Sequence, residues 1–169
     1  MQKEIQDKIF QLIEQQQSLF LSTISTEISE TISLPYSSYA PYVSDLEEQA
    51  FYLFLSDLSE HSHFLRANPN ASILIMADEA NTEQIFARVR VQYQVSSELI
   101  ENEPERQTAI KTMHQRFGEI IDILQALSDF RIYKLTPEQG RYVEGFGRAF
   151  NIKNGLVGEI SPVKPDKKA

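Results

Sequence analysis

The chain has 169 residues and a mass of 19.4 kDa, which suits one domain with a substantial core. It has no cysteine, which excludes disulfides and thiolate chemistry, and no apolar run of membrane-spanning length. A net charge of −8 disfavours nucleic acid as a partner, because phosphate binding requires clustered lysines and arginines. The first residues carry no basic stretch before an apolar region, so we expect no secretory signal and a cytoplasmic protein.

The N-terminal third predicts a helix followed by strands. An apolar stripe at helical spacing predicts a packing helix: Ile5, Ile9, Leu12 and Ile13. Segments 18–24 and 32–34 are predicted as paired strands separated by a polar turn at 26–30. Two prolines predict an edge or kinked strand over 36–43. The nearly all-apolar segment 50–55 is typical of a strand buried on both faces or against a partner subunit.

The middle of the chain predicts a short helix between strands. The helix covers residues 59–67, with Ser59 or Ser56 near its cap and Asn68-Pro69-Asn70 ending it. Segment 71–76 is again apolar and predicts a strand. Segment 85–95 alternates apolar and polar residues, which predicts one long strand with two distinct faces.

The last third predicts the main helix over 103–126, despite Gly118 inside it, and then more strands. These are expected at 130–135 and 141–143 around a turn at 137–140, with a bend at Gly145-Phe146-Gly147. The tail 153–169 lacks apolar periodicity and is expected to be loose. Because regular βαβ alternation is missing, the domain over 1–152 is predicted to be mostly β, an antiparallel barrel with flanking helices.

Two groups of residues are candidates for binding an anionic cofactor. The first lies around the start of the short helix: Ser56, Ser59, His61 and Ser62. The second is Arg88 and Arg90, which share a face of the predicted strand because they are two residues apart. The alternative is that the serines only cap the helix and the arginines pair with surface carboxylates.

Metal binding and hydrolysis are not expected. His61 and His63 are two residues apart, so on a helix they point about 200° apart and cannot chelate one ion. The sequence has no Gly-x-Ser-x-Gly nucleophile motif, and no residue is identified as a catalytic acid or base.

Five motifs occur in order between about residues 15 and 152. They are Ser38-Tyr39-Ala40-Pro41-Tyr42-Val43, Leu55-Ser56-x-Leu58-Ser59-x-His61-Ser62-x-x-Leu65-x-x-Asn68-Pro69, Phe86-Ala87-Arg88-Val89-Arg90, Arg116-Phe117-Gly118-Glu119-Ile120-Ile121-Asp122 and Gly145-Phe146-Gly147-Arg148-Ala149-Phe150. Together they resemble the haem-utilisation branch (HugZ/HutZ type) of the pyridoxamine-phosphate-oxidase-like, FMN-binding split-barrel superfamily. The resemblance implies a six-stranded antiparallel split barrel that forms a homodimer, with a cofactor in the cleft between subunits and the aromatic run 51–54 in the interface.

The resemblance also implies roles for individual residues. FMN phosphate would be held near Ser56 to Ser62 and by the following strand; haem would occupy the same cleft, near His61 and Arg90. The haem branch is expected to carry a proximal histidine in the C-terminal tail, supported by an acidic residue matched here by Asp129. Haem iron takes a His, Cys, Met or Tyr ligand, and residues 153–169 contain none of these.

We therefore expect an FMN-binding split-barrel oxidoreductase. Its cofactor-binding residues would be Tyr39, Ser56, His61, Ser62, Arg88, Arg90 and Asp129. One alternative is a haem-binding or haem-degrading protein with a non-standard axial ligand, His61 or His63. A second alternative is a cofactor-free dimer used for haem storage or protein interaction.

Overall fold

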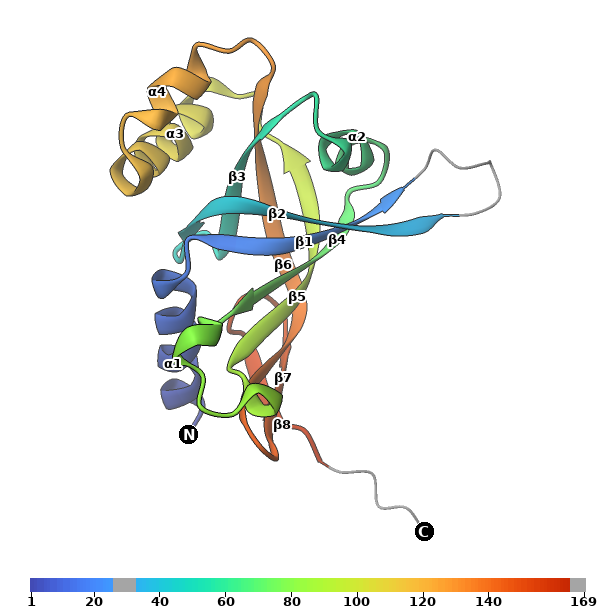
Figure 1. The fold of residues 1–169 in the computed structure, drawn as a ribbon, viewed down its shortest axis with the longest axis vertical. Coiled ribbons are helices and arrows are strands. Elements are labelled where there is room, and N and C mark those ends of the chain that lie inside the picture. Colours follow the sequence, from blue (N-terminus) through green and yellow to red (C-terminus); the bar gives the residue numbers. More distant parts are fainter. Residues whose placement is uncertain (26–32, 165–169) are drawn as a thin grey trace.

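A computed structural model describes residues 1–25 and 33–164 (Figure 1). The elements are α1 (Gln2–Gln15), β1 (Ser18–Ser25), β2 (Leu34–Asp45), β3 (Ala50–Ser56), α2 (Glu60–Ala67), β4 (Asn70–Met76), η1 (Glu79–Asn81), η2 (Ile85–Ala87), β5 (Arg90–Leu99), α3 (Glu103–Phe117), α4 (Ile120–Gln125), β6 (Phe130–Gly145), β7 (Arg148–Lys153) and β8 (Glu159–Pro162). The predicted polar turn at 26–30 lies outside the described residues, as does Ile32.

Six of the described strands form a closed antiparallel ring. They follow the order β3-β2-β1-β4-β5-β6, and β6 then pairs with β3 along Phe51↔Leu135 to Ser56↔Phe130. β7 and β8 extend the sheet from β6 as a ribbon, at the lower end of Figure 1. The ring, together with its flanking helices, confirms the predicted six-stranded antiparallel barrel.

The barrel interior is the main core. Alternate side chains along each strand point into the barrel, as expected for a sheet with one buried face. Several large side chains of this core are less than 2% exposed: Leu19, Leu21, Tyr42, Phe51, Leu53, Ile73, Ile75 and Tyr93. The apolar stripe of α1 packs against the same cluster, which confirms the predicted packing helix.

β3 is buried on both faces by its own chain. Phe51 and Leu53 point into the barrel, whereas Tyr52 and Phe54 pack in a second cluster with Ile110 and Met113 of α3. All four aromatic and aliphatic side chains of 51–54 are at most 9% exposed. The expectation that this run forms a subunit interface is therefore wrong, because the α3–α4 pair already covers its outer face.

The predicted strand over 85–95 is wrong in its first five residues. Residues 85–87 form the 3-10 helix η2, in which the Gln84 side chain accepts from the Phe86 backbone N–H at 3.4 Å. Ile85 and Phe86 are exposed rather than inward. The strand begins at Arg90, and from there the alternation is as predicted, with buried Val91, Tyr93 and Val95.

The predicted helix over 103–126 is two helices. Gly118 ends α3 with a φ of +75°, a backbone conformation that residues other than glycine rarely adopt. The short helix α4 then folds back beside α3, at the upper left of Figure 1.

β6 is one strand where two strands and a turn were predicted. Pro137 lies opposite Val95 at a register shift, where a β-bulge tolerates a residue without a backbone N–H. Gly140 faces the Tyr93 ring, and a Cβ at this position would lie 2.6 Å from it. The turn-like composition therefore reflects a bulge and a close backbone approach.

The segment after Lys153 is not loose as far as residue 164. Glu159–Pro162 form β8 against β7, and Leu156 is fully buried. The Leu156 carbonyl accepts from the hydroxyl of Tyr93 at 2.8 Å, so this segment closes the lower part of the core.

Arg116, from one of the five motifs, joins the N-terminal helix to α3. Its guanidinium donates to the Glu14 carbonyl at 3.1 Å and lies 5.6 Å from the centre of the Tyr42 ring. The last turn of α1 contains no basic residue, so Arg116 supplies the positive charge that the carbonyl end of this helix favours.

No helix in the described part of the chain is long and apolar enough to cross a membrane.

Candidate cofactor site

The end of β3 is tied to the loop before β6. The Ser56 hydroxyl donates to the Asp129 carboxylate at 2.5 Å and accepts from the Leu58 backbone N–H at 3.1 Å. The Asp57 backbone N–H donates to the Asp129 carbonyl at 2.7 Å. Two of the predicted site residues, Ser56 and Asp129, are therefore direct partners.

The serines at the start of α2 are turned toward the backbone. Ser62 is fully buried and donates to the Ser56 carbonyl at 2.8 Å, and Ser59 donates to the same carbonyl at 2.6 Å. The two hydroxyls lie 2.9 Å apart. Their hydrogen atoms are thus used inside the chain, and the serines shape the corner rather than presenting donors to a ligand.

His61 lies on α2 next to β2. Its Nδ1 is 2.9 Å from the Ser38 hydroxyl oxygen, and the Ser38 hydroxyl donates to the Leu21 carbonyl at 3.3 Å. With its single hydrogen used, Ser38 accepts from Nδ1–H, which leaves a lone pair on Nε2. Burial lowers the pKa of His61, so the neutral imidazole is favoured.

Arg88 and Arg90 are at the opposite end of the barrel. Ser56 is opposite Phe130 on β6, whereas Arg90 is opposite Val143, 13 residues further along the same strand. Arg88 donates to the Ala77 carbonyl at 2.7 Å and pairs with Glu79 at 3.1 Å. Within one chain, the structure does not bring the arginines to the serines, and they do not share a strand face.

The surroundings of Arg88 and the outer barrel face are partly apolar. A hollow of about 620 Å³ beside Arg88 is lined by Phe20 and Met76 among others. Tyr39, another predicted site residue, is 64% exposed on the outer face, in register with Phe20 on β1. Phe86 in η2 is 83% exposed.

Sequence reasoning missed two cations near Ser56. Arg66 of α2 and Arg131 of β6 both pair with the Asp57 carboxylate, Arg131 at 3.2 Å. Arg131 reaches this corner because it lies opposite Leu55 in the β3–β6 pairing. The position of Arg66 in the last turn of the predicted short helix could have indicated it from the sequence. Arg131 could be found only from the pairing of β3 with β6.

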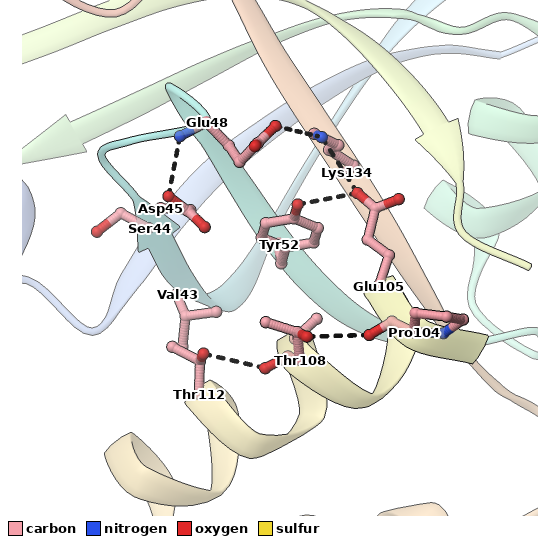
Figure 2. A pocket seen from close by; sticks show the side chains of 11 residues that line it. Val43, Ser44, Asp45, Glu48, Tyr52, Pro104, Glu105, Thr108, Thr112 and Lys134 are labelled. Carbon is pink, nitrogen blue, oxygen red and sulfur yellow. Dashed lines mark hydrogen bonds and ion pairs between the residues drawn. The ribbon is translucent and has the colours of Figure 1, made fainter. Parts of the chain in front are cut away.

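A second hollow, of about 440 Å³, lies between α3 and the β2–β3 hairpin (Figure 2). Glu105 accepts there from the Tyr52 hydroxyl at 3.0 Å and from Lys134 at 3.1 Å, and Lys134 also pairs with Glu48. Burial raises the pKa of Tyr52 to about 12, so its hydroxyl stays protonated and donates. These groups satisfy one another, and they fasten α3 to the barrel.

A family model for pyridoxamine 5'-phosphate oxidase matches residues 5–144. This chain belongs to that family. Within the pyridoxamine 5'-phosphate oxidase family it belongs to the HutZ-type branch, which confirms the prediction from the five motifs. It is 33% identical over 153 residues to the heme oxygenase HutZ of Vibrio cholerae serotype O1, a match that covers 90% of this chain and 83% of HutZ.

Two solved structures of this family support the same assignment. A crystal structure of HutZ from Vibrio cholerae, described as the heme storage protein, has a TM-score of 0.70 at 31% identity, covering 78% of this chain and 89% of that chain. The crystal structure of Campylobacter jejuni ChuZ has a TM-score of 0.80 at 27% identity, covering 99% and 68%. The names given to HutZ specify haem, so the expected preference for FMN over haem is not supported.

Proposed function

We propose that this protein binds haem in a cleft between two copies of the chain, with His61 as an axial ligand. The observation that carries the proposal is the contact that orients His61: Nδ1 lies 2.9 Å from the Ser38 hydroxyl oxygen. When Nδ1 carries the hydrogen, Nε2 keeps the lone pair that an iron ligand needs. Histidines that bind metals typically have their other ring nitrogen held by a hydrogen bond of this kind. The similarity to HutZ, named for haem in both comparisons, supports the same ligand.

The loop before α2 and the arginines paired with Asp57 offer groups that suit a flat, amphipathic ligand with anionic groups. Leu58, between Ser56 and α2, is 85% exposed and offers an apolar contact. Arg66 and Arg131 supply positive charge at the same corner. Haem supplies the redox-active iron when bound, and the chain contributes the imidazole, the apolar contact and the charges.

A second copy of the chain would complete the site. Arg88 is held by Ala77 and Glu79, and Arg90 by the Arg88 carbonyl, so among the described residues neither arginine makes a hydrogen bond or ion pair with the α2 corner of its own chain. The exposed aromatic pair Phe20 and Tyr39 lies on the outer face of the barrel, where a partner could cover it. An antiparallel dimer through this face would bring Arg88 and Arg90 of one subunit toward His61 of the other.

A hemin titration followed by absorption spectroscopy tests the ligand. Wild-type protein is expected to give a Soret band with saturation in the micromolar range, and His61→Ala is expected to shift or abolish that band. His63→Ala is the matched control, because His63 is exposed on the same helix. Absence of a Soret change at tens of micromolar hemin would overturn the proposal, and an unchanged spectrum in His61→Ala would remove His61 as ligand.

Sedimentation velocity tests the dimer. Tyr39→Glu places a charge on the outer face without touching the core, since Tyr39 is 64% exposed. We expect wild-type dimers, and monomers with weakened haem binding in the variant. A monomeric wild-type protein that binds haem normally would contradict the shared cleft.

A second candidate function is oxidative haem breakdown, favoured by the name heme oxygenase given to HutZ. The haem-loaded protein is incubated with ascorbate in air and the Soret band is followed. Loss of the band with release of iron supports an oxygenase, whereas a stable band supports storage. A parallel incubation with FMN is expected to leave the melting temperature unchanged.

A further inference from the structure

Asp57 holds two arginines from different elements at the α2 corner. Its carboxylate accepts from Arg66 of α2 and from Arg131 of β6, the latter at 3.2 Å. The Nη1 group of Arg131 is also fixed by the carbonyls of Ser128 and Phe130, at 2.8 and 3.1 Å. The two guanidinium groups are therefore positioned by the chain before any ligand arrives.

Much of each guanidinium group remains open to solvent. The Arg66 and Arg131 side chains are 40% and 42% exposed, whereas Asp57 is 23% exposed. Each guanidinium carries five N–H donors in a fork that matches a carboxylate, and Asp57 engages each arginine through one nitrogen. A second carboxylate can bind the remaining donors or exchange with Asp57.

A buried hydroxyl below the arginines has no partner. Tyr133 lies two residues after Arg131 on β6 and is 1% exposed, and among the described residues its hydroxyl makes no hydrogen bond. Burial raises the pKa of Tyr133, and the Arg66 charge opposes that rise. A buried donor without a partner is unfavourable, and an anion held by the two arginines would supply one.

We propose that Arg66 and Arg131 bind the carboxylate groups of haem, with the Tyr133 hydroxyl as a further donor. This inference rests on the proposed haem site and names the anion grip within it. The exposed Leu58 follows Asp57 directly, so the apolar ring contact and the cations adjoin. The chemistry recognised is an anionic oxygen, which a flavin phosphate also carries, and the experiment separates the two sources.

The test compares haem with a derivative whose two carboxylates are esterified and therefore uncharged. Haem and haem dimethyl ester share the ring and the iron, but the ester lacks the carboxylates. We expect wild-type protein to prefer haem over the ester, and Arg66→Gln/Arg131→Gln to lose roughly 10- to 100-fold in haem affinity with little change for the ester. Arg141→Gln, an exposed arginine on the far part of β6, is the control and should leave both affinities unchanged.

Each outcome separates the inference from the proposed function. If wild-type protein binds neither haem nor the ester, the proposed function fails. If it binds both equally, or if the double variant loses both to the same extent, the haem site stands and the arginine grip is wrong. A double variant that loses FMN relative to riboflavin but keeps haem would assign the cations to a phosphate and overturn the inference.

Two further variants test the arginines with smaller changes to the protein. Arg131→Lys keeps the charge but removes the fork, so an intermediate loss of haem affinity is expected. Asp57→Asn removes the competing carboxylate while the carbonyls of Ser128 and Phe130 still hold Arg131, so it is expected to tighten haem binding several-fold. Weaker haem binding in Asp57→Asn, with an unchanged melting temperature, would contradict the exchange of carboxylates.

Discussion

The Ser56 hydroxyl and the Asp129 carboxylate are hydrogen-bonded at 2.5 Å, although the two residues lie in different parts of the chain. The bond joins the end of β3 to the start of β6, where these strands close the barrel. The acidic residue that the family resemblance assigned to a tail histidine is thus bound to a serine of its own chain. This pair is therefore part of the barrel closure as well as of the candidate site.

Ser56→Ala should lower the free energy of unfolding by about 1–2 kcal/mol, because it leaves a partly buried carboxylate without its donor. Urea denaturation measures this difference. Ser128→Ala, one residue before Asp129 and exposed, is the control and should change it by less than about 0.5 kcal/mol. Equal effects of the two substitutions would show that the Ser56–Asp129 bond adds no stability.

Gly118→Ala should destabilise the protein by about 1–2 kcal/mol through backbone strain. Gly118 has a φ of +75°, and an added Cβ would have no neighbour within 4 Å among the described residues, so no clash contributes. Gly145→Ala is matched, since its Cβ would also be in open space and its φ is not positive. The difference between the melting temperatures of the two variants measures the cost of placing alanine at a positive φ. Similar melting temperatures would show that Gly118 is not needed for its backbone conformation.

Glu105→Gln should lower stability at neutral pH by about 1 kcal/mol more than Glu103→Gln in the same first turn of α3. The Asn102 side chain, and then Lys134 and Tyr52, hold the pKa of Glu105 below its usual value. A lowered folded-state pKa contributes stability above the unfolded value of 4.5, and this contribution is lost as pH falls below it. The difference between the two variants should therefore be larger at pH 7 than at pH 3.

His61 should make stability fall on mild acidification. Burial lowers its pKa below 6.5, so the unfolded chain takes up a proton first, and the folded state loses stability as pH drops through 6.5 toward the folded-state pKa. His61→Gln should flatten the melting temperature between pH 7.5 and 5.5, while His63→Gln keeps the wild-type slope. The same protonation should weaken haem binding over this range if Nε2 binds iron.

Local patterns predicted the elements whose residues alternate or repeat along one segment. The stripe Ile5 to Ile13 and the apolar run 50–55 are examples, and both lie where expected. The short helix after Ser59 follows from its cap residue and from Pro69. For such elements, the information lies within a few residues of sequence.

Features that depend on distant pairing were not predictable. Pro137 and Gly140 have the composition of a turn, and only the register with β5 shows a bulge and a close contact with Tyr93. Arg88 and Arg90 alternate as in a strand, but the 3-10 helix η2 ends at Arg88 and the strand begins only at Arg90. The pairing of Arg131 with Asp57 requires the β3–β6 register, which no local pattern encodes.

The closure of the ring by β6 has a consequence for synthesis of the chain. β3 ends at Ser56 and its partner β6 begins at Phe130, so on the ribosome roughly 4 to 15 s pass between them at about 5–20 residues per second. During that interval the first five strands form at most an open sheet, with the edges of β3 and β5 bare to other nascent chains. A ribosome stall between these strands would therefore leave two unpaired strand edges exposed, a condition that favours aggregation.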